Sequence, residues 1–507
     1  MLKFNVSEDQ QWLILSQASD DVEKKQIEIS LTKKIHNWYF HPLVKKKIWD
    51  GSICFIEKKG AFWKVPVGLW REVLQIGEEF GITIDIEGLD RLILNELTLE
   101  EFQSWVDEFF EGKDITPRDY QVEAAWKIVK YRYSVSEIAT SSGKTLISFM
   151  IFAFLKQRGM IRKFLVIVPN TNLVFQGNED FTDYGIEDLG VRIQQIGGGT
   201  KLREGCDLII GTFHSLVKKD DDFFEEVDAV FVDEAHHTNS MSIKKIVAKC
   251  MHCKWRFGLT GTLTKRGSAD HLTIQQFLGP VIVEISPDFL FKNKHATPVH
   301  IKIVMMDWLD PEIKEKLSDL KANSQNLEGN ELYNLEKKLV VESEKRLKYV
   351  VDFISRTSKN SLVLFQSVKD EYGKQIWNRL RETTNDKEVF YVDGDTDESL
   401  REEYKTRMSD GENKVLVATY GTFSTGISIN NLHNIFLVES YKSEVLIKQS
   451  LGRGMRKMEG KEKVNVIDFV DDFSSPKYKN YLMKHADVRI QIYRNEKFKY
   501  KIFNVKL

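Results

Sequence analysis

The chain has 507 residues, enough for two to four domains with their own hydrophobic cores. A hydrophobic fraction of 42% and a charged fraction of 29% are ordinary for a soluble globular protein, and no stretch approaches the length of a membrane span. The first residues, "MLKFNVSEDQQW", lack the basic and apolar regions of a signal peptide, so we expect a cytoplasmic protein without a membrane partner. The net charge of −2 gives no global basic field to indicate a nucleic-acid partner.

The sequence before residue 113 predicts a small α/β unit. The run "GSICFIEKKGAFWKVPV" has the composition of a β-hairpin that turns near residues 58–60. The next segment indicates the packing face of a helix, because apolar residues recur at helical spacing: Trp70, Val73, Leu74 and Gly77. The stretch from Asp85 to Asp114 carries ten Asp or Glu and ends in "EGKDITP", which we interpret as a linker.

Short β-rich runs dominate the next part of the chain, from Thr116 to about Pro287. Four of them are continuous apolar runs, as expected of parallel strands that are buried on both faces: "KFLVIVP", "CDLIIGT", "DAVFVDEA" and "WRFGLTGT". Each run ends in a polar or glycine-containing turn. Ligands of open α/β sheets bind at the carboxyl ends of the strands, so we expect a binding site along this edge.

The same pattern returns after a charged helical stretch that begins near residue 313. Its candidate strands are "NSLVLFQSV", "EVFYVDGD", "KVLVATY", "NIFLVES" and "VNVIDFV". The predicted fold class is therefore α/β, with two doubly wound parallel sheets.

Cys250 and Cys253 form the one closely spaced cysteine pair of the sequence, in "CMHC". A structural zinc site needs four ligands, and no second ligand pair is visible in the sequence. We therefore favour buried thiols at the edge of a strand and expect no zinc.

Residues 477–506 combine nine Lys or Arg with interleaved aromatic side chains. Such alternation suits contact with phosphates together with stacking on bases. A solvated helix followed by an edge strand would give the same pattern, and the sequence does not separate the two interpretations.

The segment "EIATSSGKTLISF" looks like a phosphate-binding loop. The pattern G-x-x-x-x-G-K-[ST] is met at Gly143, Lys144 and Thr145, but Ile138 occupies the position of the first glycine. A short strand and a turn of small residues precede Gly143, and an apolar helix follows, so backbone N–H groups can surround a phosphate. Lys144 would neutralise phosphate charge, and Thr145 would reach Mg²⁺. The turn itself consists of Thr140, Ser141 and Ser142.

The run "AVFVDEAHH" supplies the second part of a nucleotide site. Asp233, at the carboxyl end of the predicted strand, can hold Mg²⁺, and Glu234 can orient and deprotonate the attacking water. His236 completes the segment Asp-Glu-Ala-His. An acidic cap on a following helix would explain the same residues, but the upstream Lys144 makes a nucleotide site the better interpretation.

With these motifs the chain resembles the superfamily-2 helicases that carry a DEAH-type box, over about residues 116–470 and in the family's order. The resemblance implies two tandem RecA-like doubly wound parallel-sheet domains, preceded here by a small α/β (α+β) accessory domain. "TPRDYQ" resembles the adenine-recognising segment of the family, which implies that Gln121 hydrogen-bonds the base edge, with Arg118 and Tyr120 nearby.

Further motifs resemble the family's contacts with nucleic acid. "IVPNTNLVFQ" and "IIGTFHSL" resemble segments that grip the nucleic-acid backbone, and "ATYGTFSTGISI" resembles a contact of the second domain with both ATP and the strand. "LTGT", with Thr260 and Thr262, resembles the element that couples hydrolysis to strand movement. The implied nucleic-acid contacts are Pro169, Asn170, Thr212, Gln366, Thr419 and Thr425, with Gly426 on the nucleotide side.

"QSLGRGMR" matches the family motif Q-x-x-G-R-x-x-R in full, which implies that Gln449, Arg453 and Arg456 face the γ-phosphate from the second domain. An arginine from a second domain stabilises the charge on the γ-phosphoryl group in the transition state, with a typical effect of ~10³–10⁵ in rate. The resemblance thus implies ATP and Mg²⁺ as cofactors and a catalytic set of Lys144, Glu234, Arg453 and Arg456.

Nearly the whole chain is similar to the UvsW-type branch-migration helicases of T-even bacteriophages, in stretches such as "NWYFHPLVKKKIWDGSICFI" and "QQIGGGTK". This likeness implies a monomer in the host cytoplasm that remodels branched DNA with ATP. It assigns Lys45, Lys46, Lys47 and Trp49 to an accessory DNA-binding domain, although a tight approach to the hairpin would also explain Trp49.

The expected domains are an accessory domain at residues 1–112, an ATP-binding RecA-like domain at 113–290, a second RecA-like domain at 291–475 and a basic aromatic tail at 476–507, packed on the motor. Three other functions stay open: an RNA helicase or translocase, the motor subunit of a restriction or nuclease system, and a nucleic-acid-binding module with an inactive ATPase fold. The intact set of Lys144, Asp233, Glu234 and Arg453 argues against the last.

Overall fold

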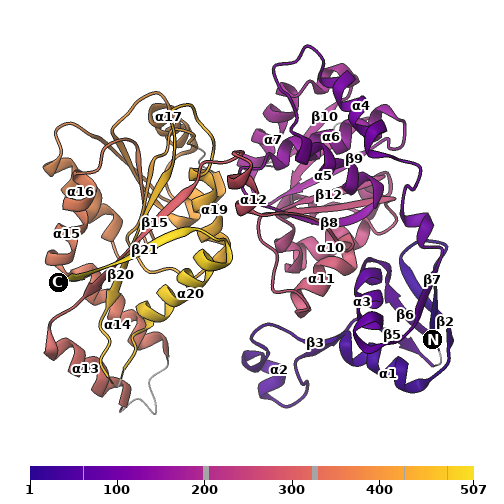
Figure 1. Cartoon of the computed structure of the whole chain (residues 1–507), viewed down its shortest axis with the longest axis horizontal. Helices are drawn as coiled ribbons and strands as arrows, with labels where there is room; N and C mark the ends of the chain where they lie inside the picture. Colours follow the sequence, from indigo (N-terminus) through magenta and orange to yellow (C-terminus); the bar gives the residue numbers. More distant parts are fainter. Residues whose placement is uncertain (61, 198–204, 323–328, 427–428, 477) are drawn as a thin grey trace. The chain divides into compact units, whose positions relative to one another are not determined.

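The computed structural model describes residues 1–60, 62–197, 205–322, 329–426, 429–476 and 478–507 (Figure 1). The chain divides into two compact units, Met1–Ala139 with Gly143–Ile285, and Thr140–Ser142 with Ser286–Leu507. The first unit holds a five-stranded and a seven-stranded sheet, and the second unit holds another seven-stranded sheet. Among the described residues, no helix is both long and apolar enough to cross a bilayer.

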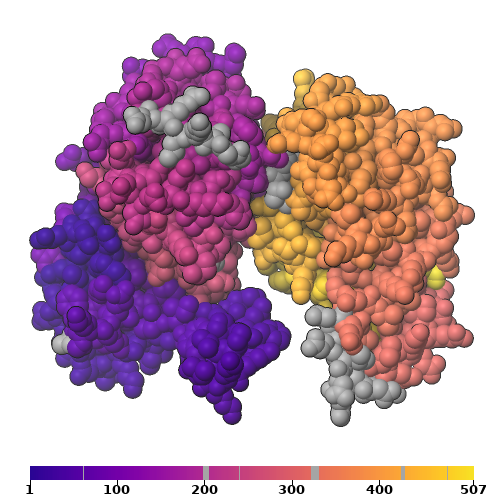
Figure 2. All heavy atoms as spheres, turned by 180° about the vertical axis from the view of Figure 1, so that it is seen from behind, coloured from indigo at the N-terminus to yellow at the C-terminus, as the bar shows by residue number. Residues whose placement is uncertain are grey.

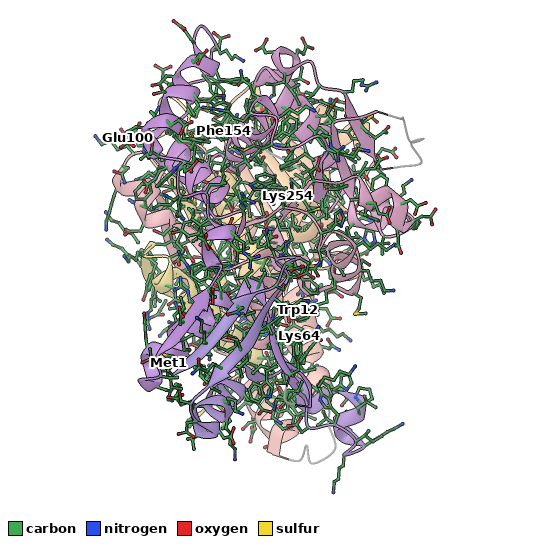
Figure 3. All side chains as sticks on the ribbon, turned by 90° about the vertical axis from the view of Figure 1, so that its right-hand side faces the viewer. Met1, Trp12, Lys64, Glu100, Phe154 and Lys254 are labelled. Carbon is green, nitrogen blue, oxygen red and sulfur yellow. The ribbon has the colours of Figure 1, made fainter. Side chains whose placement is uncertain are left out.

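The five-stranded sheet forms the core of the accessory domain. Its strand order is β5-β6-β2-β1-β7, with β1 (Leu2–Val6), β2 (Trp12–Ala18), β5 (Glu57–Lys59), β6 (Phe62–Pro66) and β7 (Ile84–Glu87). The predicted hairpin is confirmed as β5 and β6, which pair antiparallel. Figure 3 labels Trp12 and Lys64 on neighbouring strands, where the Lys64 ammonium lies 3.6 Å from the centroid of the indole ring.

Two helices cover this sheet, α1 (Asp21–Ser30) and α3 (Trp70–Phe80), and the 3₁₀ turn η2 (Val67–Leu69) leads into α3. Of the predicted helical stripe, Trp70, Val73 and Gly77 are buried and Leu74 is half-buried against the same core. The core also contains Tyr133 and Leu272, which belong to the seven-stranded part of the unit. The accessory domain is therefore built into the first unit.

Residues 35–51 leave the accessory domain between two short strands, and we call them the aromatic loop. The strands β3 (Thr32–Lys34) and β4 (Ser52–Cys54) pair antiparallel at the base of the loop. The loop contains η1 (Trp38–Phe40) and α2 (Pro42–Lys45), and it projects from the rest of the first unit (Figures 1 and 2). Its exposed large apolar side chains are Trp38, Tyr39, Phe40, Leu43 and Ile48.

The seven-stranded sheet of the first unit is parallel throughout, in the order β10-β11-β9-β12-β13-β8-β14. Its strands are β8 (Tyr133–Ile138), β9 (Phe164–Val168), β10 (Ile193–Ile196), β11 (Leu208–Thr212), β12 (Ala229–Asp233), β13 (Trp255–Thr260) and β14 (Val281–Ile285). All four predicted apolar runs and the strand before the phosphate-binding loop are confirmed. The two edge strands, β10 and β14, were not predicted from the sequence.

Helices flank this sheet on both faces. They are α5 (Asp119–Lys130), α6 (Lys144–Gln157), α7 (Thr171–Asp183), α8 (Phe213–Leu216), α9 (Asp221–Glu225), α10 (Met241–Lys249) and α11 (Ala269–Leu278). A further helix, α4 (Leu99–Phe110), lies within the acidic stretch and packs on α6, because the rings of Phe102 and Trp105 contact Phe154, which is labelled in Figure 3. Most of the acidic stretch is therefore folded, and the unstructured connection is confined to its end.

The seven-stranded sheet of the second unit is also parallel throughout, in the order β17-β18-β16-β19-β20-β15-β21. Its strands are β15 (Val299–Asp307), β16 (Ser361–Phe365), β17 (Glu388–Val392), β18 (Lys414–Thr419), β19 (Asn434–Leu437), β20 (Val464–Asp472) and β21 (Lys499–Lys506). Five of these strands were predicted as strands of this sheet. The basic tail forms the helix α20 (Tyr481–Asn495) and the edge strand β21, the two elements expected in one of the two interpretations of its pattern.

The remaining helices of the second unit are α12 (Pro287–Lys292), α13 (Pro311–Ala322), α14 (Gly329–Glu342), α15 (Glu344–Ser355), α16 (Tyr372–Thr383), α17 (Glu398–Ser409), α18 (Tyr420–Gly426) and α19 (Glu444–Gly454). Helix α14 holds the tail in place, because the buried carboxylate of Glu336 accepts hydrogen bonds from the backbone N–H groups of Tyr481 and Leu482. These are free N–H groups at the start of α20, so a side chain from another helix caps it.

Two buried ion pairs join helices to β20. The Arg346 guanidinium donates to both carboxylate oxygens of Asp471, at 2.6 and 2.8 Å, and to the backbone carbonyl of Val438. Arg489 of α20 pairs with Asp468 in the same way, at 2.9 and 2.8 Å. Buried charges are tolerated when both partners are hydrogen-bonded in this manner, and removing one partner leaves the other charge uncompensated.

We expect Arg346→Met to destabilise the second unit by about 3–5 kcal/mol, because Asp471 would keep a buried charge without its partner. Arg379→Met is the matched control: Arg379 is 39% exposed and pairs with Glu344, so its loss should cost less than about 1 kcal/mol. Urea unfolding of the full chain measures both. Equal losses in the two variants would contradict a special role for the buried pair.

Candidate nucleotide and nucleic-acid site

The phosphate-binding loop runs from the end of β8 to the start of α6. Ile138 is the last residue of β8 and is fully buried, so the position of the family's first glycine lies inside the sheet. The left-handed backbone conformations fall instead on Ser141, with φ 68°, and on Gly143, with φ 83°. Gly143 precedes the first turn of α6, which no side chain caps, so the free N–H groups there suit a phosphate.

Lys144 lies beside the carboxylates at the end of β12. Its Nζ is 3.3 Å from Oε1 of Glu234. Glu234 has a left-handed backbone with φ 52°, and its N–H donates to Oδ1 of Asp233 at 2.9 Å. The Glu234 carboxylate therefore points toward Lys144, whereas the Asp233 carboxylate accepts from the backbone N–H of the next residue.

The two carboxylates have opposite pKa shifts. Burial and the neighbouring charge of Glu234 raise the pKa of Asp233 to about 6. Burial alone would also raise the pKa of Glu234, but the charges of Lys144 and His236 outweigh it and lower that pKa below its usual range. Glu234 is thus ionised at neutral pH, and a cation next to Asp233 would favour its ionised form as well.

His236 connects Glu234 to the end of β13. Its Nδ1 lies 2.8 Å from Oγ1 of Thr260 and 3.3 Å from Oε2 of Glu234. Thr260 Oγ1 in turn donates to the backbone carbonyl of Thr262 at 3.0 Å and accepts from its N–H at 3.2 Å. The predicted coupling residues therefore contact the acidic segment through His236 and through Thr260 itself, whose Oγ1 lies 3.5 Å from Oε2 of Glu234.

The predicted adenine-recognising residues lie at the start of α5, next to the phosphate-binding loop. Gln121 is buried and accepts a hydrogen bond from the N–H of Arg118 at 2.9 Å, and the Arg118 guanidinium is 3.4 Å from the Tyr120 hydroxyl. A Cβ atom added to Gly143 would lie 2.2 Å from Nε2 of Gln121. The left-handed backbone at position 143 favours glycine, and a side chain there would have to displace the Gln121 amide.

These groups fit a magnesium nucleotide. Mg²⁺ is held in such sites by one or two protein oxygens together with phosphate oxygens. Asp233 and Thr145 supply hard oxygen ligands at the ends of β12 and the phosphate-binding loop, and Lys144 and the first turn of α6 offer positive charge to phosphates.

The predicted nucleic-acid contacts of the first unit lie at the carboxyl ends of β9 and β11. Pro169 and Asn170 follow β9, and the Asn170 side chain caps α7 by accepting from the N–H of Leu173 at 3.0 Å. Thr212 ends β11 and caps α8 by accepting from the N–H of Ser215 at 3.3 Å. Both side chains thus fix the start of a helix at the ligand-binding edge of the sheet.

In the second unit, Gln366 and Thr419 also lie at the carboxyl ends of strands. Thr419 accepts from the N–H of Thr422 at the start of α18, at 3.2 Å. The N–H of Gln366 donates to the buried carboxylate of Glu439 at 2.6 Å, and its Oε1 accepts from Tyr333 at 3.2 Å. Sequence reasoning missed both partners of Gln366, because they lie 73 and 33 residues away along the chain.

The arginine motif lies on and just after α19. Gln449 is half-buried within the helix, and Arg453, in its last turn, has its guanidinium 5.7 Å from the ring centroid of Phe423. Arg456 lies 3.3 Å from the side-chain oxygen of Asn430. The surroundings of the Thr425 side chain and of Gly426 lie outside the described residues.

The thiols of Cys250 and Cys253 are buried, as predicted. Cys250 directly follows α10, and Cys253 lies just before β13, where its Sγ is 2.9 Å from the carbonyl oxygen of Val227.

In the aromatic loop, the predicted Lys45, Lys46 and Lys47 are exposed. Trp49 is half-buried: its Nε1 donates to the carbonyl of Ser52 at 2.9 Å, and its ring meets that of His41 edge-on. The structure thus assigns Trp49 to the base of the loop. The exposed rings belong to residues 38–40, which the sequence analysis missed, although three consecutive aromatics before three consecutive lysines were a visible signal.

The strain at Ser141 gives a prediction for the missing glycine. Ser141→Gly should stabilise the protein by up to about 1 kcal/mol, because glycine adopts a left-handed conformation without the penalty of a side chain. Ser142→Gly, one residue further, should give no gain, since Ser142 has no positive φ. Thermal melting of the two variants compares them. A larger gain in melting temperature from Ser142→Gly than from Ser141→Gly would show that the backbone strain does not lie at Ser141.

Two family models match the chain. The family described as "Type III restriction enzyme, res subunit" matches residues 114–265, and the family described as "Helicase conserved C-terminal domain" matches residues 345–458. The first match contains the phosphate-binding loop and both carboxylates, and the second contains Arg453 and Arg456.

Similar proteins extend these matches. The ATP-dependent DNA helicase uvsW of Enterobacteria phage T4 is 29% identical over 490 residues, which cover 92% of this chain and 93% of the relative. The DNA 3'-5' translocase XPB2 of Sulfurisphaera tokodaii is 25% identical over 364 residues, which cover 67% and 78%. A solved structure of S. cerevisiae Dbp5 bound to RNA and ADP BeF3 has a TM-score of 0.51 at 13% identity, covering 82% and 96%.

The Dbp5 likeness supports the fold, and the site brings together the elements expected of an ATPase. The similarity to the phage helicase spans almost the whole chain, and both family models match the segments that carry the site motifs. The chain therefore belongs to the superfamily-2 helicases, ATP-hydrolysing enzymes built on two RecA-like domains.

Proposed function

We propose that this helicase acts on DNA and remodels branched structures such as forks, D-loops and four-way junctions. The observation that carries the proposal is the combination, in one compact unit, of a Lys144–Glu234–Thr260 site with an exposed basic and aromatic loop. The site provides ATP-driven movement, and the loop provides a contact outside the motor. The names of the T4 and Sulfurisphaera relatives support DNA as the nucleic acid.

We assign the chemical roles as follows. Lys144 and the first turn of α6 bind the phosphates, Asp233 and Thr145 hold Mg²⁺, and Gln121 binds the base, with Arg118 and Tyr120 beside it. When bound, Mg²⁺ neutralises charge that develops on the phosphates. Arg453 and Arg456 act on the γ-phosphate when the second RecA-like domain closes, and Gln449 supports them; the complete Q-x-x-G-R-x-x-R motif supports this role.

The ion pair between Lys144 and Glu234 suggests how nucleotide binding prepares the base. Lys144 cannot bind phosphate oxygens fully while it remains 3.3 Å from Glu234, so nucleotide binding should draw its ammonium away. Glu234 would then lose the Lys144 charge, which lowers its pKa. A carboxylate released in this way becomes a stronger base for the attacking water.

Glu234→Gln should therefore keep ATP and DNA binding while turnover falls by about 10²–10⁴, the usual contribution of a general base. Glu226→Gln is the control, since Glu226 is 70% exposed and pairs with Lys163 at the surface. ATP hydrolysis rates and nucleotide binding, measured on both variants, decide the role. Parallel losses of nucleotide affinity and rate in Glu234→Gln would contradict it.

Movement along a strand would follow from contacts of both RecA-like domains with the nucleic-acid backbone. We place these contacts at Pro169, Asn170 and Thr212 in the first domain, and at Gln366, Thr419 and Thr425 in the second. Phosphate contacts carry no sequence information, so substrate choice should depend on the shape of the DNA. Domain closure and opening with each ATP would then move the contacts in alternation.

The accessory domain, which we propose to be residues 1–112, would recognise the branch. In the aromatic loop, Tyr39 is 53% and Phe40 is 62% exposed, and the Lys34 ammonium lies 4.5 Å from the ring centroid of Trp38. Exposed rings stack on unpaired bases, and lysines bind the adjacent phosphates. A second candidate is RNA, which Dbp5 binds in the similar solved structure, so the test includes it.

Replacing Trp38, Tyr39 and Phe40 by alanine should weaken junction binding by about 1–3 kcal/mol for each base that no longer stacks, while leaving single-strand-stimulated ATPase in place. Replacing Lys45, Lys46 and Lys47 should lower the salt slope of duplex binding by about 0.9 for each phosphate that is no longer bound. Phe80→Ala, which removes a 46% exposed ring elsewhere in the accessory domain, is the control.

The measurement is binding and unwinding of forks, four-way junctions, blunt duplex, single strands and RNA duplex. Point variants are preferable to deleting the accessory domain, because deletion would uncover Tyr133 and Leu272 of the shared core. Stronger stimulation by RNA than by any DNA would overturn the proposed substrate. Unchanged junction unwinding in the loop variants would remove the aromatic loop from branch recognition.

A further inference from the structure

The eight residues between β13 and α11, residues 261–268, connect the nucleotide site to the accessory domain, and we call them the coupling loop. At one end the loop is held near the nucleotide site: Thr262 bonds with Thr260, and the N–H of Leu263 donates to the Glu137 carboxylate at 3.2 Å. Glu137 lies on β8, just before the phosphate-binding loop. This end of the coupling loop is therefore positioned by groups that surround the nucleotide.

At its other end the coupling loop is held by α11. The N–H of Gly267 donates to Nδ1 of His271 at 3.3 Å, and Ser268 caps the helix by accepting from the N–H of His271 at 3.2 Å. Because Nδ1 accepts a hydrogen bond, the imidazole is neutral, and burial lowers the pKa of His271 in agreement with this. His271 is 3% exposed, so the contact lies in the interior of the unit.

Helix α11 is buried between two cores. Leu272 belongs to the core of the accessory domain, whereas Ile274 and Leu278 belong to a core of the seven-stranded part. In Figure 1, α11 lies beside α3 of the accessory domain, and η2 contacts it directly. A Cβ atom added to Gly68 of η2 would lie 2.0 Å from the carbonyl oxygen of Gln275, so only glycine permits this backbone approach.

A chain of polar contacts crosses this interface. Glu72 of α3 accepts a hydrogen bond from Nε2 of Gln275 at 2.9 Å, and the same Nε2 lies 3.1 Å from Nδ1 of His271. Gln275 is 2% exposed, so its amide has no access to water as an alternative partner. Arg71, the neighbour of Glu72, donates to the carbonyl of Val281 at 3.2 Å, just beyond α11.

We infer that Glu72, Gln275 and His271 are positioning residues that hold the coupling loop from the accessory side, so that nucleic acid bound by the accessory domain changes the rate of ATP hydrolysis. The inference rests on the proposed function for the coupling role of Thr260 and Thr262. It adds a route by which the branch-binding domain acts on the chemical step. Glu72 touches neither nucleotide nor reacting atoms, and it acts only through Gln275, His271 and the loop.

The test compares Glu72→Ala with Glu72→Gln in the full-length chain. Alanine removes the acceptor for the buried Gln275 amide, whereas glutamine keeps a carbonyl oxygen at the same reach. Glu79→Ala, which removes an exposed charge further along α3, is the control for charge. Thermal melting and nucleic-acid affinity are measured for each, together with ATP hydrolysis at saturating ATP with and without the most strongly stimulating nucleic acid.

Glu72→Ala should lower the stimulated kcat by about 2- to 30-fold, the range of measured long-range couplings, and raise the ATP consumed per base pair unwound. The basal rate without nucleic acid, the KM for ATP and the nucleic-acid affinity should stay within about 2-fold, and Glu72→Gln should restore the stimulated rate. Gly68→Ala, which wedges η2 away from α11, should reproduce the effect by a different route.

The inference would be overturned if Glu72→Ala and Gly68→Ala both keep the stimulated kcat and the ATP consumed per base pair unwound of the unmodified chain, whatever the change in melting temperature. An equal fall of basal and stimulated rates would overturn it as well, because that is what general destabilisation produces. If the proposed substrate is wrong, RNA rather than branched DNA stimulates ATP hydrolysis by the unmodified chain. The variants are then compared with RNA as the stimulating nucleic acid, so this test of the inference does not depend on the substrate.

Discussion

The ion pair between Lys144 and Glu234 depends on the parallel order of three neighbouring strands. In the first seven-stranded sheet, β13 lies between β12, which ends at Asp233, and β8, which leads into the phosphate-binding loop. All three strands therefore end at the same edge, where Thr260 at the end of β13 lies 3.5 Å from Oε2 of Glu234. Neighbouring strands are about 4.8 Å apart, a spacing that long side chains bridge across one intervening strand.

Strain is located at the same edge. Ser141 and Glu234 both adopt left-handed backbone conformations, each of which costs a residue with a side chain about 1–2 kcal/mol. The turn at Glu234 is held by the hydrogen bond from its N–H to Asp233, and it presents Glu234 to Lys144. Such outliers persist where the surrounding structure over-determines them, and here both lie in loops of the candidate nucleotide site.

The central strands and the site motifs could be predicted because their signals are local. Buried parallel strands such as β9 and β12 are continuous apolar runs, and the phosphate-binding loop and acidic segment directly follow strands of this kind. The edge strands were harder. In β10, "IQQI", two of the four residues are glutamines, because an edge strand has one neighbour and is less completely buried.

Contacts between distant parts of the sequence could not be predicted at all. Gly68 and Gln275 are far apart along the chain, and nothing near either residue indicates the other. Likewise, His271 occurs in a helix whose residues are buried on nearly every side, so no amphipathic pattern marks which face meets the accessory domain. Only the fold shows that this helix has two cores as neighbours.

That position of α11 limits how the first unit can move. Closely packed interiors respond to displacement as whole elements, because sliding one side chain opens a void or forces a clash with the next. A shift of the coupling loop must therefore either move α11 together with η2 or break the contact at Gly68, where backbone meets backbone without an intervening side chain. The accessory domain and the candidate nucleotide site consequently share one helix, and the aromatic loop belongs to the same compact unit as Lys144 and Glu234.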